Sequence, residues 1–146
     1  MVIVDDLIAT GGTIACAKTQ NGLAPALDPS QLLARVPDAR GFCQVEAIQP
    51  LNLDSTNIGP QHWQLLARII EDHYHCYDGF VLCHGTDTLA YSAAALSYLI
   101  QNTRKPIVLT GAQKPIDQED TDARQNLLDS LRYACSGDSG VCIVFG

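Results

Sequence analysis

The 146-residue sequence is poor in charge, since charged side chains make up 17% of it against about 25% in an average soluble domain. Basic residues are the scarcer kind: nine Lys and Arg stand against 16 Asp and Glu, for a formal net charge of −7. This balance disfavours binding to the phosphate backbone of nucleic acid. No apolar run approaches the roughly 18–20 residues of a membrane span, so we expect neither a nucleic-acid nor a membrane partner.

The six cysteines lack the spacing of a redox or zinc motif, because no two of them form a Cys-x-x-Cys pair. Cys83 and Cys142 fall inside apolar runs, where free cysteine behaves as a small buried hydrophobe. His73, His75 and Cys76 come nearest to a metal cluster, but positions 73 and 75 do not share a helix face, and we expect a solvated helix end. The N-terminus also lacks the features of a signal peptide. We therefore expect a cytoplasmic protein with reduced thiols and no metal.

Length and hydrophobic patterning predict one α/β domain over residues 1–146. Apolar, β-branched-rich runs bounded by turn residues predict strands at 2–9, 79–83, 106–110 and 141–145, with a weaker one at 44–48. Helical patterns fall between them, at 29–36, 60–75, 88–100 and 123–134. The alternation is typical of a doubly wound, mostly parallel sheet with helices on both faces, in three α/β/α layers. Residues 18–25 are expected to form a mobile, turn-rich loop.

Unusual polar segments follow two of the expected strands, at the ends where open α/β sheets bind ligands. The sequence TGGTIA occupies residues 10–15, and its two glycines let a ligand approach the backbone closely beside Thr13. The sequence HGTDT occupies residues 84–88, where a hydroxyl, a carboxylate and a helix start could hold an ammonium group and orient a nucleophile or water. The plainer interpretation is that Thr or Asp caps the helix. A nucleotide site is less well supported, because neither G-x-G-x-x-G nor a P-loop is present.

The two segments, in this order and spacing, resemble the paired signatures of the bacterial-type L-asparaginases. The resemblance continues in LDST at 53–56, DGF at 78–80, KPIVLTGAQKP at 105–115 and NLL at 126–128, so it covers nearly the whole chain. TLAYSAAAL at 88–96 and the helix that carries Trp63 are more similar to the cytoplasmic type I branch. The resemblance implies an asparaginase N-terminal domain-like fold. It also implies hydrolysis of L-asparagine, with L-glutamine as a second candidate substrate, through a threonine nucleophile, with no cofactor and with a homo-oligomeric full-length form.

The resemblance also implies residue roles, carried over by position. Thr13 corresponds to the nucleophile, Thr86 to a second nucleophilic or water-positioning hydroxyl, and Asp87 to the aspartate of the family's triad, which also grips the substrate's amino group. Ser55 corresponds to the serine that holds the substrate's carboxylate, and the backbone around Ala112 to a segment at the amide end. The full substrate-binding set that the resemblance implies is Gly12, Asp54, Ser55, Thr56, Gly85, Thr86, Asp87, Ala112 and Gln113.

Two positions depart from the family pattern. Leu23 follows Gly22 where the family usually has a tyrosine that supports the nucleophile, and leucine cannot form that hydrogen bond. The family's triad lysine falls a short way past the strand expected at 141–145, whereas the lysines of this chain are Lys18, Lys105 and Lys114. We therefore expect the isolated chain to have little or no activity.

Two other functions remain open: an amidotransferase subunit that releases ammonia for another active site, and a non-catalytic module that binds small amino acids. The tetrapeptide GDSG at 137–140 matches the nucleophile segment of trypsin-like proteases, but those proteases are all-β, so we expect a helix-to-strand turn. The acidic residues at 117–122 are expected to form a solvated loop rather than a cation site; they are Asp117, Glu119, Asp120 and Asp122.

Overall fold

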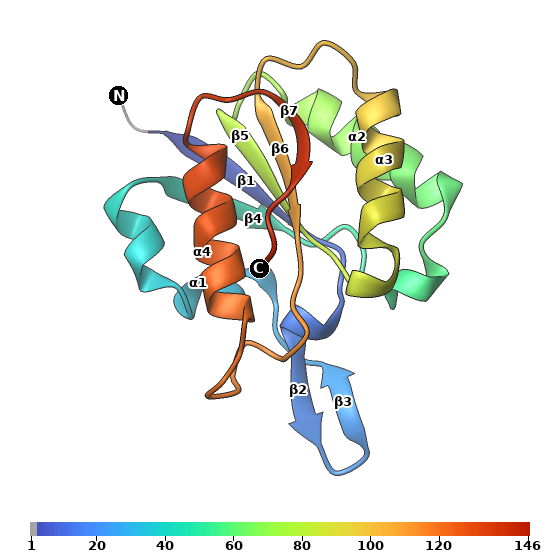
Figure 1. The fold of residues 1–146 in the computed structure, drawn as a ribbon, viewed down its shortest axis with the longest axis vertical. Helices are drawn as coiled ribbons and strands as arrows, with labels where there is room; N and C mark the ends of the chain where they lie inside the picture. The colour runs from blue at the N-terminus through green and yellow to red at the C-terminus, as the bar shows by residue number, and fades with distance from the viewer. Residues whose placement is uncertain (1–2) are drawn as a thin grey trace.

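The computed structural model describes residues 3–146 and contains a five-stranded sheet in which every neighbouring pair of strands is parallel (Figure 1). The strand order is β4-β1-β5-β6-β7. Their bounds are Val4–Ala9 for β1, Gln44–Ile48 for β4, Gly79–Cys83 for β5, Pro106–Thr110 for β6 and Gly140–Ile143 for β7. The predicted parallel α/β architecture is confirmed, and the weakest predicted strand, β4, lies at an edge of the sheet.

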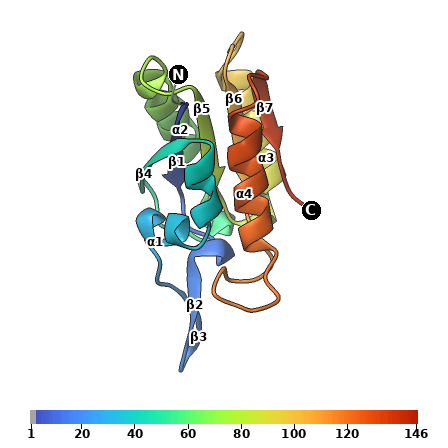
Figure 2. The same cartoon turned by 90° about the vertical axis from the view of Figure 1, so that its left-hand side faces the viewer.

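Four helices cover the sheet, two on each face (Figure 2). Helices α1 (Pro29–Ala34) and α4 (Ala123–Ala134) pack on one face, and α2 (Pro60–His73) and α3 (Leu89–Leu99) pack on the other. Proline opens α1 and α2, as expected at a position whose N–H would have no partner. A capping box strengthens the start of α1: the Gln31 backbone N–H donates to Asp28 Oδ1 at 2.8 Å, and the Asp28 N–H donates to the Gln31 side chain at 2.9 Å.

The core consists of two layers because successive strand residues point to opposite faces. Both faces are covered by helices, which explains why the strands read as continuous apolar runs rather than as alternating patterns. The layer under α1 and α4 includes Leu7, Val81, Val108, Leu127 and Leu131. The layer under α2 and α3 includes Ile8, Leu66, Phe80, Leu82 and Leu109.

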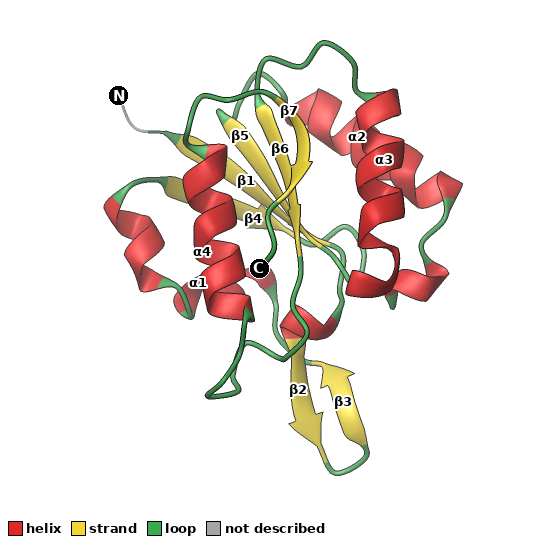
Figure 3. Ribbon diagram, viewed as in Figure 1, coloured by secondary structure: helices red, strands yellow, loops and turns green. Residues whose placement is uncertain are grey.

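Residues 18–25 form regular structure, so the expectation of a turn-rich loop is wrong. Strands β2 (Cys16–Thr19) and β3 (Gly22–Pro25) pair antiparallel in a hairpin that projects from the body of the domain (Figure 3). Gly22 has a φ of +106°, and the Thr19 hydroxyl donates to its carbonyl oxygen at 2.7 Å. Gln20 and Asn21 form the two-residue turn of this hairpin, and Gly22, the second residue of the Asn-Gly step that suggested a loop, begins β3 opposite Thr19.

The end of α2 is more than a solvated helix terminus. His73 Nδ1 lies 2.7 Å from Oδ2 of Asp6, a residue that is fully buried on β1. Burial raises the pKa of Asp6, and the contact with His73 opposes that rise. His75 and Cys76 are exposed, so the expectation of a solvated end is right for them and wrong for His73.

The acidic loop and the GDSG segment have ordinary structural roles. Asp117 pairs with Arg35, and Asp120 pairs with Lys114. The Asp122 carboxylate accepts the backbone N–H groups of residues 113 and 114. Residues 137–140 join α4 to β7, as predicted, with positive φ at both glycines.

The burial of the cysteines agrees with expectation for Cys83 but not for Cys142. All six thiols are free. Cys83 is fully buried as expected, but Cys142 is only half-buried because it lies on the edge strand β7. In the part of the chain that the structure describes, none of the helices has both the length and the apolarity needed to cross a bilayer.

Candidate active site

The carboxyl ends of β1 and β5 lie side by side where the strand order reverses. The chain passes from β1 to β4 on one side of β1 and then to β5 on its other side. Ala9 at the end of β1 is paired with Cys83 at the end of β5. The backbone N–H and the hydroxyl of Thr10 both donate to the Cys83 carbonyl oxygen, at 3.0 and 2.9 Å. Reversals of this kind are where doubly wound sheets bind ligands, and both polar segments predicted from the sequence begin here.

Two glycines bring the loops at this reversal into contact. Gly12 has a φ of +88°, and a Cβ atom placed on it would lie 2.7 Å from the Gly85 Cα atom. A Cβ atom on Gly85 would in turn lie 2.7 Å from Oγ of Ser55. Any side chain at either position would push apart the three loops that carry Thr13, Ser55 and Thr86.

The touching loops and the β2–β3 hairpin enclose a pocket of about 300 Å³. Its lining residues are Gly12, Thr13, Cys16, Leu23, Pro25, Leu53, Asp54, Ser55, Gly85, Thr86 and Asp87. The structure therefore brings together all the predicted catalytic residues and most of the predicted binding residues. Cys16 and Pro25 were missed because a hairpin pairing them was not expected, and Leu53, which precedes Asp54 and donates its N–H to the Thr10 carbonyl oxygen, was missed as well.

Three residues of the implied set do not line this pocket. The Thr56 N–H and hydroxyl donate to Asp54 Oδ1, at 2.9 and 2.7 Å, and the N–H bond is the main cause of a lowered pKa for Asp54. Ala112 is 1% exposed and belongs to the core. Gln113 is exposed, and its N–H donates to Asp122. Their roles in substrate binding stay predictions.

The segment between β5 and α3 is not explained as a helix cap. Residues 86–88 form a 3₁₀ turn before α3, and the N-cap residue Thr88 makes no capping hydrogen bond with its side chain. Its hydroxyl donates instead to the Ser55 carbonyl oxygen at 2.8 Å. Thr86 is half-buried and Asp87 is exposed, so both remain accessible to a ligand in the pocket.

A chain of hydrogen bonds supports the 84–87 loop from behind. Trp63 Nε1 donates to Ser92 Oγ at 2.8 Å, Ser92 Oγ lies 2.7 Å from His84 Nε2, and His84 Nδ1 lies 2.7 Å from the Gly85 carbonyl oxygen. The pattern is satisfied when neutral His84 donates through Nδ1 and accepts the Ser92 proton at Nε2. Burial lowers the pKa of His84, which favours the same neutral form.

This arrangement suits an amide of a small zwitterion. Two threonine hydroxyls offer nucleophiles for an acyl carbon. The Asp87 carboxylate can hold an ammonium group, and the Ser55 hydroxyl can donate to a carboxylate.

Comparison with known proteins agrees with the geometry. A family model described as "Asparaginase, N-terminal" matches residues 6–146. The chain belongs to the asparaginase family. The L-asparaginase of Thermococcus kodakarensis is 41% identical to this asparaginase-family chain over 140 residues, which are 95% of the chain and 43% of the relative. The solved thermostable L-asparaginase from that organism has a TM-score of 0.90 at 40% identity, over 98% of this chain and 44% of that one.

A relative with a different name matches the same region of this asparaginase-family chain. A glutamyl-tRNA(Gln) amidotransferase subunit of Methanopyrus kandleri is 37% identical over 139 residues, which are 92% of this chain and 30% of the relative. The chain spans less than half the length of each of these curated relatives.

Proposed function

We propose that this chain binds L-asparagine between β1 and β5 and takes part in its hydrolysis to L-aspartate and ammonia, as the N-terminal α/β domain of an asparaginase. The observation that carries the proposal is the convergence of Thr13, Ser55, Thr86 and Asp87 on one pocket of about 300 Å³. The relatives named L-asparaginase support the same reaction.

In the proposed reaction, Thr13 Oγ attacks the carbon of the side-chain amide and gives up its proton to a base. The base passes that proton to the amide nitrogen, the C–N bond breaks and ammonia leaves. Water then adds to the acyl–threonine ester, which releases L-aspartate and restores the Thr13 hydroxyl. Thr86 serves as the second hydroxyl, positioning that water or replacing Thr13 as nucleophile. Asp87 serves as the triad's aspartate and also holds the ammonium group, while Ser55 holds the carboxylate.

Gly12, Gly85 and Asp54 also line the proposed substrate site. Thr56, Ala112 and Gln113 are proposed to complete it at the more distant positions that the family resemblance implies. The substrate is small and is proposed to be L-asparagine, with L-glutamine as the alternative amide.

Calorimetric titration of the 146-residue chain with L-asparagine and L-aspartate tests the binding step. Asp87→Asn should weaken binding about 10- to 100-fold, because one charge-assisted hydrogen bond contributes about 1.5–3 kcal/mol. Asp138→Asn, which changes an exposed acid in the turn before β7, should leave binding unchanged. Failure of the wild-type chain to bind either amino acid would contradict the proposal.

Ammonia release tests the chemical step separately. We expect binding with little or no turnover by this chain alone, since none of its lysines lies in the segment that corresponds to the family's triad lysine. Any turnover that is observed should be abolished by Thr13→Ala and by Thr86→Ala, while Ser139→Ala, at an exposed serine, should retain it. Activity that survives both threonine substitutions would refute the assigned roles.

The similarity to the amidotransferase of Methanopyrus kandleri keeps ammonia release for a second active site as the alternative function. Tighter binding of L-glutamine than of L-asparagine would favour it. Binding of both amino acids with no turnover even when the family's lysine-bearing segment is supplied would favour a non-catalytic binding module.

We also propose a cytoplasmic, homo-oligomeric protein. Six free thiols fit a reducing compartment. Tyr91 and Tyr98 lie seven residues apart on α3 and are 68% and 78% exposed, which is unusual for aromatic side chains without a partner surface. Light scattering should give a mass above that of one chain, and Tyr98→Ser should lower it; a monomeric wild type would contradict this part.

A further inference from the structure

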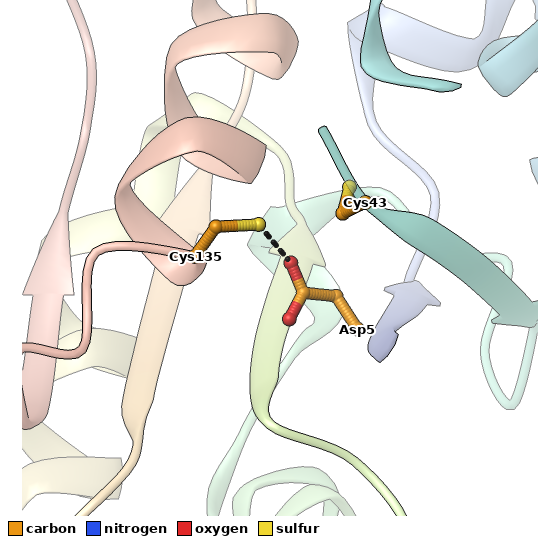
Figure 4. A group of neighbouring side chains, drawn as sticks. All are labelled: Asp5, Cys43 and Cys135. Carbon is orange, nitrogen blue, oxygen red and sulfur yellow. Dashed lines mark hydrogen bonds between the residues drawn. The ribbon is translucent and has the colours of Figure 1, made fainter. Parts of the chain in front are cut away.

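Three side chains from distant parts of the sequence meet at the amino end of the sheet. Asp5 lies near the start of β1, Cys43 precedes β4, and Cys135 follows α4. Figure 4 shows the three side chains converging from separate segments. The two Sγ atoms and a carboxylate oxygen all lie within 4.8 Å of one another, and Cys135 Sγ donates to Asp5 Oδ2 at 3.2 Å.

The carboxylate in this cluster is incompletely satisfied. Asp5 is fully buried, and its Oδ1 atom has no hydrogen bond of normal geometry from any residue in the range 3–146. A buried acceptor without a partner destabilises the folded state, and does so more strongly when it carries charge. Cys43 is 7% exposed, so water has little access from its side. A cation is the ligand that this arrangement lacks.

We propose that Asp5, Cys43 and Cys135 form a binding site for a thiophilic divalent cation of the Zn²⁺ type. Two sulfurs and one carboxylate oxygen are ligands that Zn²⁺ accepts, with Zn–S near 2.3 Å and Zn–O near 2.0–2.2 Å. Tetrahedral coordination at those lengths places ligand atoms about 3.6–3.8 Å apart. The observed spacing needs only small side-chain adjustments to reach that value, and water can supply the fourth ligand.

The surroundings permit entry and balance the charge. Cys43 lines a surface depression of about 430 Å³ and Cys135 lines another of about 290 Å³, so two depressions border the cluster, and the half-buried Cys135 is its more exposed side. Two thiolates and a carboxylate around a divalent cation leave one net negative charge. Arg104 and Lys105 line the depression beside Cys135 and offset it, although Asp78 lies there too.

A cation here would act on the fold rather than on the substrate. The site ties together residues 5, 43 and 135 at the end of the sheet opposite to the pocket, so it is independent of the proposed hydrolysis. A ligand that binds only the folded chain stabilises it by about 2.7 kcal/mol at 100 times its dissociation constant. Micromolar Zn²⁺ should therefore raise the melting temperature of the reduced chain.

Titration of the reduced 146-residue protein with Co²⁺ and then Zn²⁺ tests the site. We expect one Co²⁺ per chain, with the d–d bands of tetrahedral coordination, a sulfur-to-metal charge-transfer band of two thiolates, and displacement by Zn²⁺. Cys43→Ala and Cys135→Ala should each weaken binding at least tenfold. The matched control is Cys76→Ser, at an exposed thiol beside His73 and His75, and it should bind as the wild type does.

Three results would overturn the proposal: no metal binding by the wild type, unchanged binding in both alanine variants, or loss of binding in Cys76→Ser. Should an alanine variant fail to fold, the wild-type spectrum decides, because a Co²⁺ complex without two sulfur ligands contradicts the site. L-Asparagine titration of Cys43→Ala separates this inference from the proposed function, since amino-acid binding should persist without the metal.

Discussion

The two ends of strand β1 carry polar residues of opposite character. At its carboxyl end, the segment that carries Thr13 touches the loop after β5 through Gly12 and Gly85, and Thr13 borders the pocket. At its amino end, Asp5 and Asp6 are fully buried and contact Cys135 and His73. One end presents polar groups to a ligand, while the other encloses them in the protein.

The same strand therefore positions residues of the pocket at one end and buried, structurally paired acids at the other. The Thr13 hydroxyl at the carboxyl end costs little, because this side chain is partly exposed and borders the pocket. The buried acids at the amino end are costly unless each has a partner, since an unpaired buried carboxylate loses its solvation. Stability at the carboxyl end of β1 therefore depends on contacts between loops, and stability at its amino end depends on partners for the buried acids.

The largest effect should come from crowding the loop contact at the carboxyl end. Gly12→Ala adds a methyl group against the Gly85 backbone at a positive φ, and we expect about 3 kcal/mol or more of lost stability. The matched control is Gly22→Ala, which has a similarly positive φ but no atom within 4 Å of its Cβ position, and should cost about 1 kcal/mol. Urea denaturation measures both; equal losses would show that the contact contributes nothing.

At the amino end, removing a partner should cost less. His73→Ala leaves the Asp6 carboxyl buried without its 2.7 Å contact, and we expect a loss of about 2 kcal/mol, reduced by the partial exposure of His73. His75→Ala, at an exposed position just past the same helix, should change stability by less than about 0.5 kcal/mol. A His73→Ala protein as stable as the wild type would mean that water replaces the contact.

Stability should depend on pH in opposite directions at the two ends of the sheet. Burial lowers the pKa of His84 below its usual 6.5, so the unfolded chain takes up the proton first and stability falls as pH drops below about 6.5. The loss from this residue is at most about 1.4 kcal/mol per pH unit. The raised pKa values of Asp5 and Asp6 act in the opposite direction, because the folded state then binds more protons as pH falls.

Comparing the wild type with His84→Gln isolates the histidine contribution. The substitution should lower stability at pH 8, since the contacts to Ser92 and Gly85 are disturbed. Between pH 6.5 and 5 it should also remove the part of the pH slope that comes from His84. Parallel stability curves for the two proteins over that range would contradict a buried neutral histidine.

The smallest effect on stability should come from the hairpin over the pocket. Leu23 lines the pocket and is 51% exposed, so Leu23→Ala should change stability by less than about 0.5 kcal/mol. Its effect should appear in L-asparagine affinity, which we expect to fall several-fold as apolar contact is lost. Unchanged affinity would show that Leu23 does not contact the bound amino acid.

Sequence reasoning worked best where the signal is local. The buried strands, the proline-opened helices and the polar segments after β1 and β5 are all visible in short windows, and they led to Thr13 and Thr86. The hairpin at 16–25 was missed because its short strands are largely exposed and lack a clear apolar pattern. Its contribution to the pocket, through Cys16 and Pro25, was missed with it.

Contacts between distant residues could not be found in this way. Asp6 with His73, and Asp5 with Cys43 and Cys135, are joined only by the parallel register of the sheet and the helices packed on it. Metal-ligand motifs are recognised by close spacing in the sequence, whereas the residues of this cluster are separated by up to 130 positions, between Asp5 and Cys135. The Trp63–Ser92–His84 chain of hydrogen bonds could not be predicted either, because it also joins residues that are distant in the sequence.

That chain has a practical consequence. The protein contains a single tryptophan, and Trp63 Nε1 is hydrogen-bonded to the serine that contacts His84. Its fluorescence therefore reports from one place, two hydrogen bonds behind the loop that carries Thr86. Amino-acid binding that moves this loop, or protonation of His84, should change the emission without any added label. The intrinsic fluorescence of Trp63 can therefore be used to follow changes at the pocket.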